Sequence, residues 1–164
     1  MRLLTLCLGN ICRSPMAEGA LRARIEASPL RGRVEVDSAG TGGWHAGEPP
    51  DRRAIACARR HGVDIAGLRA RQLRAQDFHD FDLVLCADAD NLRNARRLAP
   101  AGLQERAVLL LEWAGPAVAA LAPGGEVPDP YYGGPEDFEQ VWQLVDTAAQ
   151  AVVERLLRPA LEPA

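Results

Sequence analysis

The protein has 164 residues, about the length of one domain, and a chain of this size buries roughly 70% of the surface that its unfolded form exposes. Hydrophobic residues make up 48% of the chain and charged residues 25%, so a core can form without metals or disulfides. The net charge of −3 gives no reason to expect nucleic acid or an anionic membrane as a partner. All 19 cationic residues are arginine, which excludes a Walker-type nucleotide site because that site requires a lysine.

The first half of the chain alternates between strand and helix patterns. Residues 2–7 (RLLTLC) form an apolar run typical of a strand that is buried on both faces of a sheet. Residues 14–27 repeat apolar side chains at helical spacing, and their opening Ser-Pro suits a helix start. Residues 33–40 (RVEVDSAG) are predicted as a second strand that ends in a turn. Residues 49–62 are predicted as a helix that follows prolines and stops at a glycine.

The second half continues the alternation. Residues 82–88 (DLVLCAD) and 106–113 (RAVLLLEW) are predicted as the third and fourth strands, with a helix over residues 91–99 between them. A long amphipathic helix over about residues 136–157 closes the chain. No repeat or linker divides the sequence, so we expect a single α/β domain over residues 1–164, with a parallel sheet and helices on both faces.

The loop after the first strand holds an unusual set of polar residues. The stretch LCLGNICRSP lies at the carboxyl end of that strand, where sheets of this class bind ligands. Gly9 and Asn10 both tolerate a positive φ, so the loop can fold back and point successive N–H groups inward. The following helix directs its own free N–H groups and positive dipole end at the same point, and Arg13 adds a two-pronged donor for phosphate. The stretch therefore predicts an anion site.

Cys7 would lie at the centre of these donors. Such surroundings lower the pKa of a thiol and turn it into a nucleophile, so the loop can hold a phosphoryl group and attack it. The alternative is a small buried hydrophobe, which is how most free cysteines behave. Cys12 has two interpretations as well: it packs within the loop, or it traps an oxidised Cys7 as a disulfide.

At this point the residues resemble a known family. CLGNICRS, at residues 7–14, resembles the C-x5-R-S/T phosphate loop of the low-molecular-weight protein-tyrosine phosphatases, and DPYYG, at residues 129–133, resembles their general-acid loop. VDSAGTGGW, RHG, ARQ and DLVLCADADNL match too, so the similarity spans nearly the whole chain. The resemblance implies a small doubly wound sheet in strand order 2-1-3-4. It also implies hydrolysis of phosphotyrosine in proteins through a phosphocysteine intermediate.

The resemblance also assigns roles to single residues. Cys7 becomes the nucleophile and Arg13 the clamp on the phosphate and the transition state. Asp129 protonates the departing oxygen and then activates the water that hydrolyses the phosphocysteine. An Asp-Pro pair is more often a plain turn, but a tyrosyl leaving group has a pKa of about 10 and departs poorly unless it is protonated.

Further residues support these three by resemblance. Ser14 donates a hydrogen bond to the sulfur, and Asn10 holds the shape of the loop by bonding neighbours that include Ser38. The phosphoryl oxygens are bound by the backbone N–H groups of Leu8, Gly9, Asn10, Ile11, Cys12 and Arg13. A deep cleft that admits phosphotyrosine but not the shorter phosphoserine has walls formed by Trp44, Tyr131 and Tyr132.

Two other functions are alternatives to this one. A thioredoxin-coupled arsenate reductase shares the fold and the phosphate loop, but its chemistry needs two further cysteines seven residues apart. Cys86 suits the first position, whereas Arg93 occupies the second. A non-catalytic phosphotyrosine-binding module is the third interpretation, but binding alone needs neither a nucleophile nor an acid.

Composition also suggests the setting of the protein. An arginine-only cation set with many Ala, Gly and Pro residues is typical of a GC-rich genome and predicts a bacterial source. No stretch has the length of a membrane span or the pattern of a signal peptide, so we expect a cytoplasmic protein with reduced cysteines. The histidines and cysteines show no C-x-x-C pair and no paired-His spacing, and we expect no metal and no cofactor. Expected partners are tyrosine-phosphorylated proteins, among them a bacterial autophosphorylating tyrosine kinase.

Overall fold

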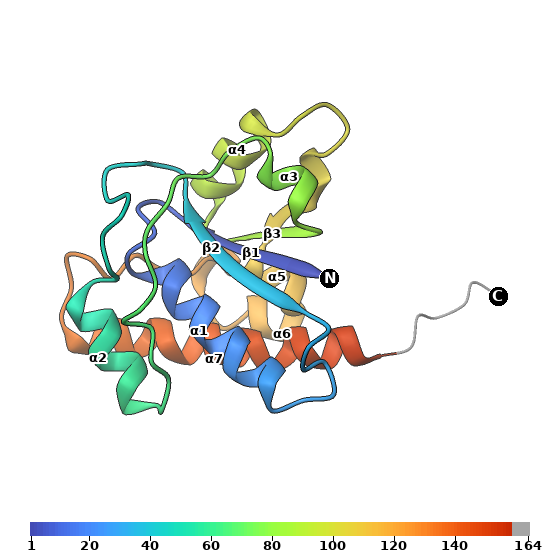
Figure 1. Ribbon diagram of the computed structural model, residues 1–164. Coiled ribbons are helices and arrows are strands. Elements are labelled where there is room, and N and C mark those ends of the chain that lie inside the picture. Colours follow the sequence, from blue (N-terminus) through green and yellow to red (C-terminus); the bar gives the residue numbers. More distant parts are fainter. Residues whose placement is uncertain (159–164) are drawn as a thin grey trace.

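Four parallel strands form one sheet in the order β2-β1-β3-β4 in a computed structural model of the protein, which describes residues 1–158 (Figure 1). The strands are β1 (Arg2–Cys7), β2 (Glu35–Gly40), β3 (Leu83–Cys86) and β4 (Ala107–Leu109). The sheet is parallel throughout, and both its class and its order confirm the prediction. β1 is an inner strand, because β2 pairs with one of its edges and β3 with the other.

Helices cover both faces of the sheet (Figure 1). One face carries α1 (Arg13–Glu26), α2 (Arg52–Arg60), α5 (Leu110–Ala114), α6 (Pro116–Ala119) and α7 (Pro135–Leu157), and the other carries α3 (Asp77–Asp80) and α4 (Ala89–Leu98). Two single-turn 3₁₀ helices, η1 (Gln104–Arg106) and η2 (Pro123–Gly125), lie in the connections.

The apolar run of β1 accounts for its inner position. Its residues after Arg2 are all buried, and they alternate between the two cores: Leu3 packs beneath α1 and α7, whereas Leu4 and Leu6 pack beneath α3 and α4. Phe78 from α3 and Phe138 from α7 are fully buried in the two opposite cores. The strand that ends at the candidate nucleophile is thus covered on both faces.

The fourth strand is shorter than predicted, and this prediction is wrong beyond Leu109. The sequence favours a strand over 106–113, but only Ala107–Leu109 pairs with β3, and Leu110–Ala114 turns into α5. β3 offers only a short partner, and Leu, Glu and Ala form helices readily, so the remaining apolar residues reach the core from a helix. Apolar runs of this length fit a buried strand and a buried helix equally well.

The four predicted helices exist with ends that differ from the prediction by at most three residues, as at α4, which begins at Ala89 and not at residue 91. α3 and α6 form in stretches for which the sequence predicts no element. The last six residues of the predicted domain lie outside the described residues. Between residues 1 and 158, no helix combines the length and the apolar character that a membrane crossing demands.

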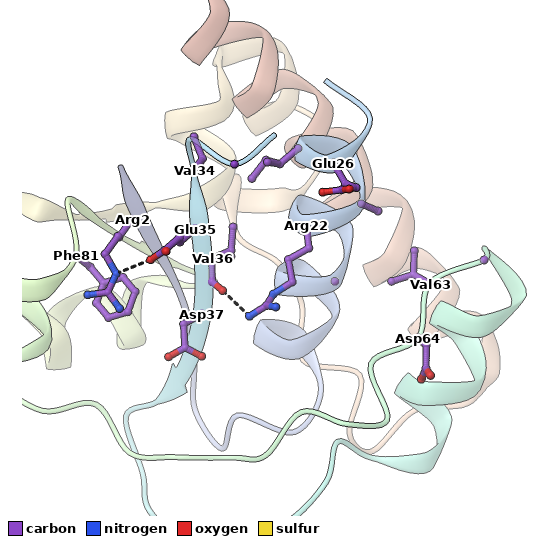
Figure 2. Close-up of a pocket in the computed structure, with 15 residues that line it drawn as sticks. Arg2, Arg22, Glu26, Val34, Glu35, Val36, Asp37, Val63, Asp64 and Phe81 are labelled. Carbon is purple, nitrogen blue, oxygen red and sulfur yellow. Dashed lines mark hydrogen bonds and ion pairs between the residues drawn. The ribbon is translucent and has the colours of Figure 1, made fainter. Parts of the chain in front are cut away.

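An opening of about 790 Å³ runs along the free edge of β2 beside α1 and the turn after α2 (Figure 2). Arg22 crosses it and donates to the Val36 carbonyl at 2.7 Å, and Arg2 pairs with Glu35 at 3.1 Å. Its walls carry both signs of charge and no thiol, and the predicted phosphate loop lies elsewhere.

Candidate active site

The loop between β1 and α1 carries the predicted nucleophile. Cys7 is the last residue of β1 and only 3% exposed, and its Sγ lies 3.0 Å from the Ser14 Oγ in the first turn of α1. Within the described part of the chain, no group accepts a hydrogen bond from the backbone N–H groups of residues 8–13. These donors, at the N-terminus of a 14-residue helix, are available to an anion.

Asn10 fixes the shape of the loop. It is the one non-glycine residue with a positive φ (58°) among residues 1–158, a conformation that asparagine tolerates. Its Nδ2 donates to the Ser14 Oγ at 2.8 Å and to the Ser38 Oγ at 3.0 Å, and its Oδ1 accepts from the Arg71 N–H at 3.0 Å. One amide therefore joins the loop to α1, to β2 and to the segment after α2.

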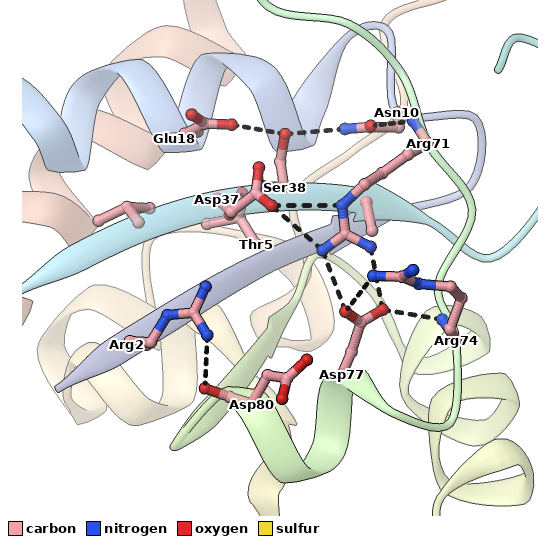
Figure 3. Close-up of polar contacts among 12 residues, drawn as sticks. Arg2, Thr5, Asn10, Glu18, Asp37, Ser38, Arg71, Arg74, Asp77 and Asp80 are labelled. Carbon is pink, nitrogen blue, oxygen red and sulfur yellow. Dashed lines mark hydrogen bonds and ion pairs between the residues drawn. The ribbon is translucent and has the colours of Figure 1, made fainter. Parts of the chain in front are cut away.

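The Ser38 hydroxyl continues this network toward α1 (Figure 3). It donates to the Glu18 Oε1 at 2.7 Å, and Arg22 pairs with the other oxygen of that carboxylate at 2.6 Å. Burial raises the pKa of Glu18 above its ordinary value, and the Ser38 and Arg22 contacts only partly offset this effect.

Arg71 supports the loop from behind, and Figure 3 shows its side chain between two acids. Its guanidinium donates to Asp37 at 3.2 Å and to both oxygens of Asp77, at 3.0 and 3.1 Å. Asp77 is completely buried, and it also accepts from the Arg74 N–H at 2.8 Å. This ion pair fixes the backbone of residue 71, which in turn holds Asn10.

Arg13 is buried beside Cys7 and held by acceptors from distant parts of the chain. Its Nη1 donates to the Asp88 Oδ2 at 2.6 Å and to the Val127 carbonyl at 3.1 Å, and its Nη2 lies 3.8 Å from the Asp129 Oδ2. Burial alone would lower the pKa of Arg13, but the charge of Cys7 and the Asp88 carboxylate outweigh it and raise that pKa. The Arg13 guanidinium is therefore held in place, remains charged and faces the loop.

Asp129 lies at the rim and is 46% exposed. Its Oδ1 accepts from the Tyr131 N–H at 3.1 Å, which is the side-chain turn expected of Asp-Pro. Arg53 holds the rest of this loop, because it donates to the carbonyls of Tyr131 at 2.9 Å and Gly133 at 3.2 Å. Asp51, the N-cap of α2, in turn binds Arg53.

A cleft of about 260 Å³ opens above the thiol. Its lining includes the predicted residues Cys7, Leu8, Gly9, Ile11, Cys12, Arg13, Trp44, Asp129, Tyr131 and Tyr132. The structure thus brings together two motifs that are more than 100 residues apart. Asn10, Ser14 and Ser38 lie behind the loop, outside the lining.

Cys12 is the N-cap of α1 and is buried in the same loop. Burial, followed by the Asp51 charge, raises its pKa well above the ordinary thiol value, so it remains a protonated thiol at neutral pH.

Sequence analysis missed several residues that position the site. His45 lines the cleft beside Gly9, with its Nδ1 2.6 Å from Glu48. Asp88, which binds Arg13, carried a usable signal: it caps α4 in a capping box with Asn91. Arg71 lies in the ARQ stretch that resembles the family, but neither it nor Asp77 was assigned a role, because their partners come from distant strands and loops.

Comparison with known proteins decides the family. The model of the family described as low molecular weight phosphotyrosine protein phosphatase matches residues 2–160. The chain belongs to this family. It is 47% identical over 154 residues to a low molecular weight protein-tyrosine-phosphatase of Streptomyces coelicolor, covering 93% of this chain and 91% of that protein.

Solved structures of the phosphatase family agree with this membership. The crystal structure of YfkJ from Bacillus subtilis has a TM-score of 0.85 at 37% identity and covers 95% of this chain and 94% of that chain. Vibrio vulnificus Wzb in complex with benzylphosphonate has a TM-score of 0.80 at 28% identity, with coverages of 94% and 97%. The predicted family is thereby confirmed, along with the membership of this chain among protein-tyrosine phosphatases.

Proposed function

We propose that this phosphatase hydrolyses phosphotyrosine in proteins through a phosphocysteine intermediate. One observation carries the proposal: a buried thiol with a serine hydroxyl 3.0 Å from its sulfur shares one cleft with a fixed guanidinium and a rim carboxylate. These are the groups that attack, charge stabilisation and leaving-group protonation require.

In the first step, the Cys7 thiolate attacks phosphorus and the bond to the phenolic oxygen breaks. The loop N–H groups and Arg13 bind the three outer phosphoryl oxygens, where charge is concentrated in the transition state. The Asp129 carboxyl gives its proton to the departing oxygen, so a neutral phenol leaves. The products of this step are the phenol and the phosphocysteine.

In the second step, the Asp129 carboxylate takes a proton from water while the water oxygen attacks phosphorus. The bond between sulfur and phosphorus breaks, and inorganic phosphate is formed. The Ser14 hydroxyl hydrogen-bonds the departing sulfur at the 3.0 Å separation already present, which stabilises the thiolate. The proton on Asp129 then prepares the enzyme for another turnover.

The cleft supports a preference for aryl esters. Tyr131 and Tyr132 pack edge to face with ring centroids 4.9 Å apart, and Trp44 faces the same cleft, so an aromatic ring finds aromatic neighbours. The buried sulfur suits the length of phosphotyrosine, because a phosphoserine side chain brings its backbone closer to the rim. In Vibrio vulnificus Wzb, the ligand in the solved structure is benzylphosphonate.

A disulfide relay of the arsenate reductase kind has little support. Cys86 is buried at the end of β3, and Arg93, at the position where that relay needs a cysteine, is exposed on α4 and pairs with Asp90. A purely binding module would have no use for the proton transfer for which Asp129 is placed.

The proposal extends to the setting of the enzyme. We place it in the cytoplasm of a bacterium, with tyrosine-phosphorylated proteins, including an autophosphorylating tyrosine kinase, as its substrates. The four unpaired cysteines and the Streptomyces relative support this placement.

The test is turnover of p-nitrophenyl phosphate and of matched phosphotyrosyl and phosphoseryl peptides. We expect hydrolysis of the first two with little activity on the third. Rapid quenching should trap phosphate on Cys7, and Cys7→Ser should lower kcat by at least about 10⁴-fold while still binding phosphate in a calorimeter. Near-normal turnover by Cys7→Ser, or thiol-dependent arsenate reduction without ester hydrolysis, would contradict the proposal.

A further inference from the structure

A second cluster of reactive side chains lies between α2 and α7, outside the lining of the cleft. Cys57 on α2, His61 at the C-cap of that helix and Glu139 on α7 each offer one ligand atom, and the three atoms lie within 4.8 Å of one another. In residues 1–158, this is the only such group of three. We propose that it binds one Zn²⁺ ion, which braces α2 against α7.

The spacing along α2 suits a shared metal. Cys57 and His61 are four residues apart, so they lie on the same face of the helix about one turn apart. In one common zinc arrangement, two histidines at this spacing are completed by a carboxylate, and here Cys57 takes the place of one histidine. The third ligand is 78 residues beyond His61, which is why the sequence analysis predicted no metal site.

The three ligand atoms lie within 4.8 Å of one another and reach the spacing of a tetrahedral site through small side-chain movements. Zinc bonds of about 2.0–2.3 Å to N, O and S place ligand atoms about 3.3–3.7 Å apart. The Cys57 Sγ lies 3.4 Å from the Glu139 Oε2, and the His61 Nε2 lies 2.7 Å from the Oε1. Small side-chain rotations lengthen the His61–Glu139 separation, and the ion then replaces the hydrogen bonds that Cys57 and His61 make with Glu139.

The surroundings orient the ligands and leave one side open. The His61 ring stacks on Trp142 with centroids 5.3 Å apart and an interplanar angle of 14°, which fixes the direction of its Nε2. Gln143 donates to the Glu139 Oε1 at 3.0 Å. Cys57 is buried, whereas His61 and Glu139 are about one-third exposed, so the ion enters from solvent and keeps a water as its fourth ligand.

Two features weaken the binding of Zn²⁺ at this cluster. Burial, then the Glu139 carboxylate, raises the pKa of Cys57 to about 11, so Zn²⁺ must displace the thiol proton into solvent as the S–Zn bond forms. Arg60 also lies 3.7 Å from the Glu139 Oε2, but its side chain is about half exposed and free to swing away. Removing that cation should therefore strengthen binding.

The experiment uses tag-free, full-length Cys7→Ser protein, so that the phosphate-loop thiol contributes nothing. Zn²⁺ affinity is measured by competition with a chromophoric chelator, and Co²⁺ reports thiolate coordination through its charge-transfer band. We expect one ion per chain, and a thermal unfolding midpoint that rises with Zn²⁺. Arg60→Ala should bind about two- to fivefold more tightly.

Ligand variants decide the location. In the same background, Cys57→Ala and His61→Phe should each lose at least about 100-fold in affinity, whereas Cys86→Ala, which removes another buried thiol, should not. His61→Phe keeps a ring on Trp142 and lies at the surface, so it tests the site even where Cys57→Ala unfolds. With Cys7 restored, His61→Phe should hydrolyse p-nitrophenyl phosphate normally. No Co²⁺ band in the Cys7→Ser protein, or a band unchanged by His61→Phe, would overturn the proposal.

Discussion

The floor and the mouth of the cleft are built in opposite ways. At the floor, Asn10 and Arg13 are buried, and each is tied to several partners on other elements. At the mouth, Trp44 is 71% exposed and Tyr132 is 96% exposed. No hydrogen bond recorded for residues 1–158 holds either of these aromatic side chains. One end of the cleft is fixed and the other is adaptable.

This difference matches two separate tasks. Transition-state stabilisation requires donors held in place before the reaction, whereas recognition of varied protein surfaces tolerates side chains that adjust. Substitutions at the floor should therefore lower kcat or the stability of the fold, and substitutions at the mouth should mainly raise KM.

The largest effect is expected at Asp129, which is exposed like the residues at the mouth but has a proposed role in the chemistry. Asp129→Asn should slow esters of basic phenols by about 10²–10⁴-fold and esters of acidic phenols far less, since a good leaving group needs little protonation. The measurement is a plot of kcat/KM against leaving-group pKa, which should steepen in the variant. If all esters slow equally, Asp129 serves only as a turn residue.

Arg71 tests how firmly the floor is held. Arg71→Met leaves the fully buried Asp77 with a charge and no guanidinium at hydrogen-bond distance, so the free energy of unfolding should fall by about 3 kcal/mol or more. Arg74→Met is the matched control, because Arg74 is largely exposed and its guanidinium lies 3.7 Å from the same acid; there we expect less than about 0.5 kcal/mol. Urea denaturation measures both. Equal losses would show that Arg71 has no special structural role.

Trp44 tests the mouth directly. Trp44→Ala should raise KM for phosphotyrosyl peptides by about tenfold, the equivalent of one lost aromatic contact, and leave kcat nearly unchanged. The small ester p-nitrophenyl phosphate, which reaches less of the rim, should be affected less. A fall in kcat for both substrates would contradict the division between floor and mouth.

Asp51 gives the smallest effect, and it depends on pH. The Arg53 side-chain hydrogen bond holds the pKa of Asp51 below its ordinary value. An acid whose folded-state pKa is depressed adds stability above its unfolded pKa of about 3.9, and this stability is lost as pH falls through the folded-state pKa. Asn caps helices as well as Asp does. The free energy of unfolding of Asp51→Asn should therefore be lower than that of the wild type at neutral pH, and the difference should disappear in acid. A difference that does not change with pH would mean that packing, and not charge, is its cause.

Sequence reasoning predicted the parts of the fold in which one chemical feature forces one structure. The apolar residues of β1 show no helical spacing that would compete with a strand. The loop after β1 carries a motif that is typical of few sites other than phosphate loops. Leu110 and Leu111 show the limit: both are buried as expected, but in a helix, because burial alone does not choose a backbone conformation. The length of β3 limits how far β4 can pair. The residues of β4 therefore do not determine where that strand ends.

The candidate site divides in the same way. Cys7 and Arg13 share one short motif, and resemblance added Asp129. The residues that hold them, such as Arg71 for Asn10 and Asp88 for Arg13, lie 61 and 75 positions from their partners. The sequence around Arg71 and Asp88 draws attention to both residues but does not identify their partners, and only the packing of the chain reveals the pairing.

The inner position of β1 also affects how the enzyme is made. Cys7 ends β1, but that strand is completed by β3, some 80 residues later, and Arg13 depends on Val127, 114 residues away. Pairing across such distances pays a loop-closure cost and belongs to the late, cooperative part of folding. A nascent or truncated chain therefore carries the thiol without the groups that make it reactive, and catalytic competence arrives only with the whole sheet.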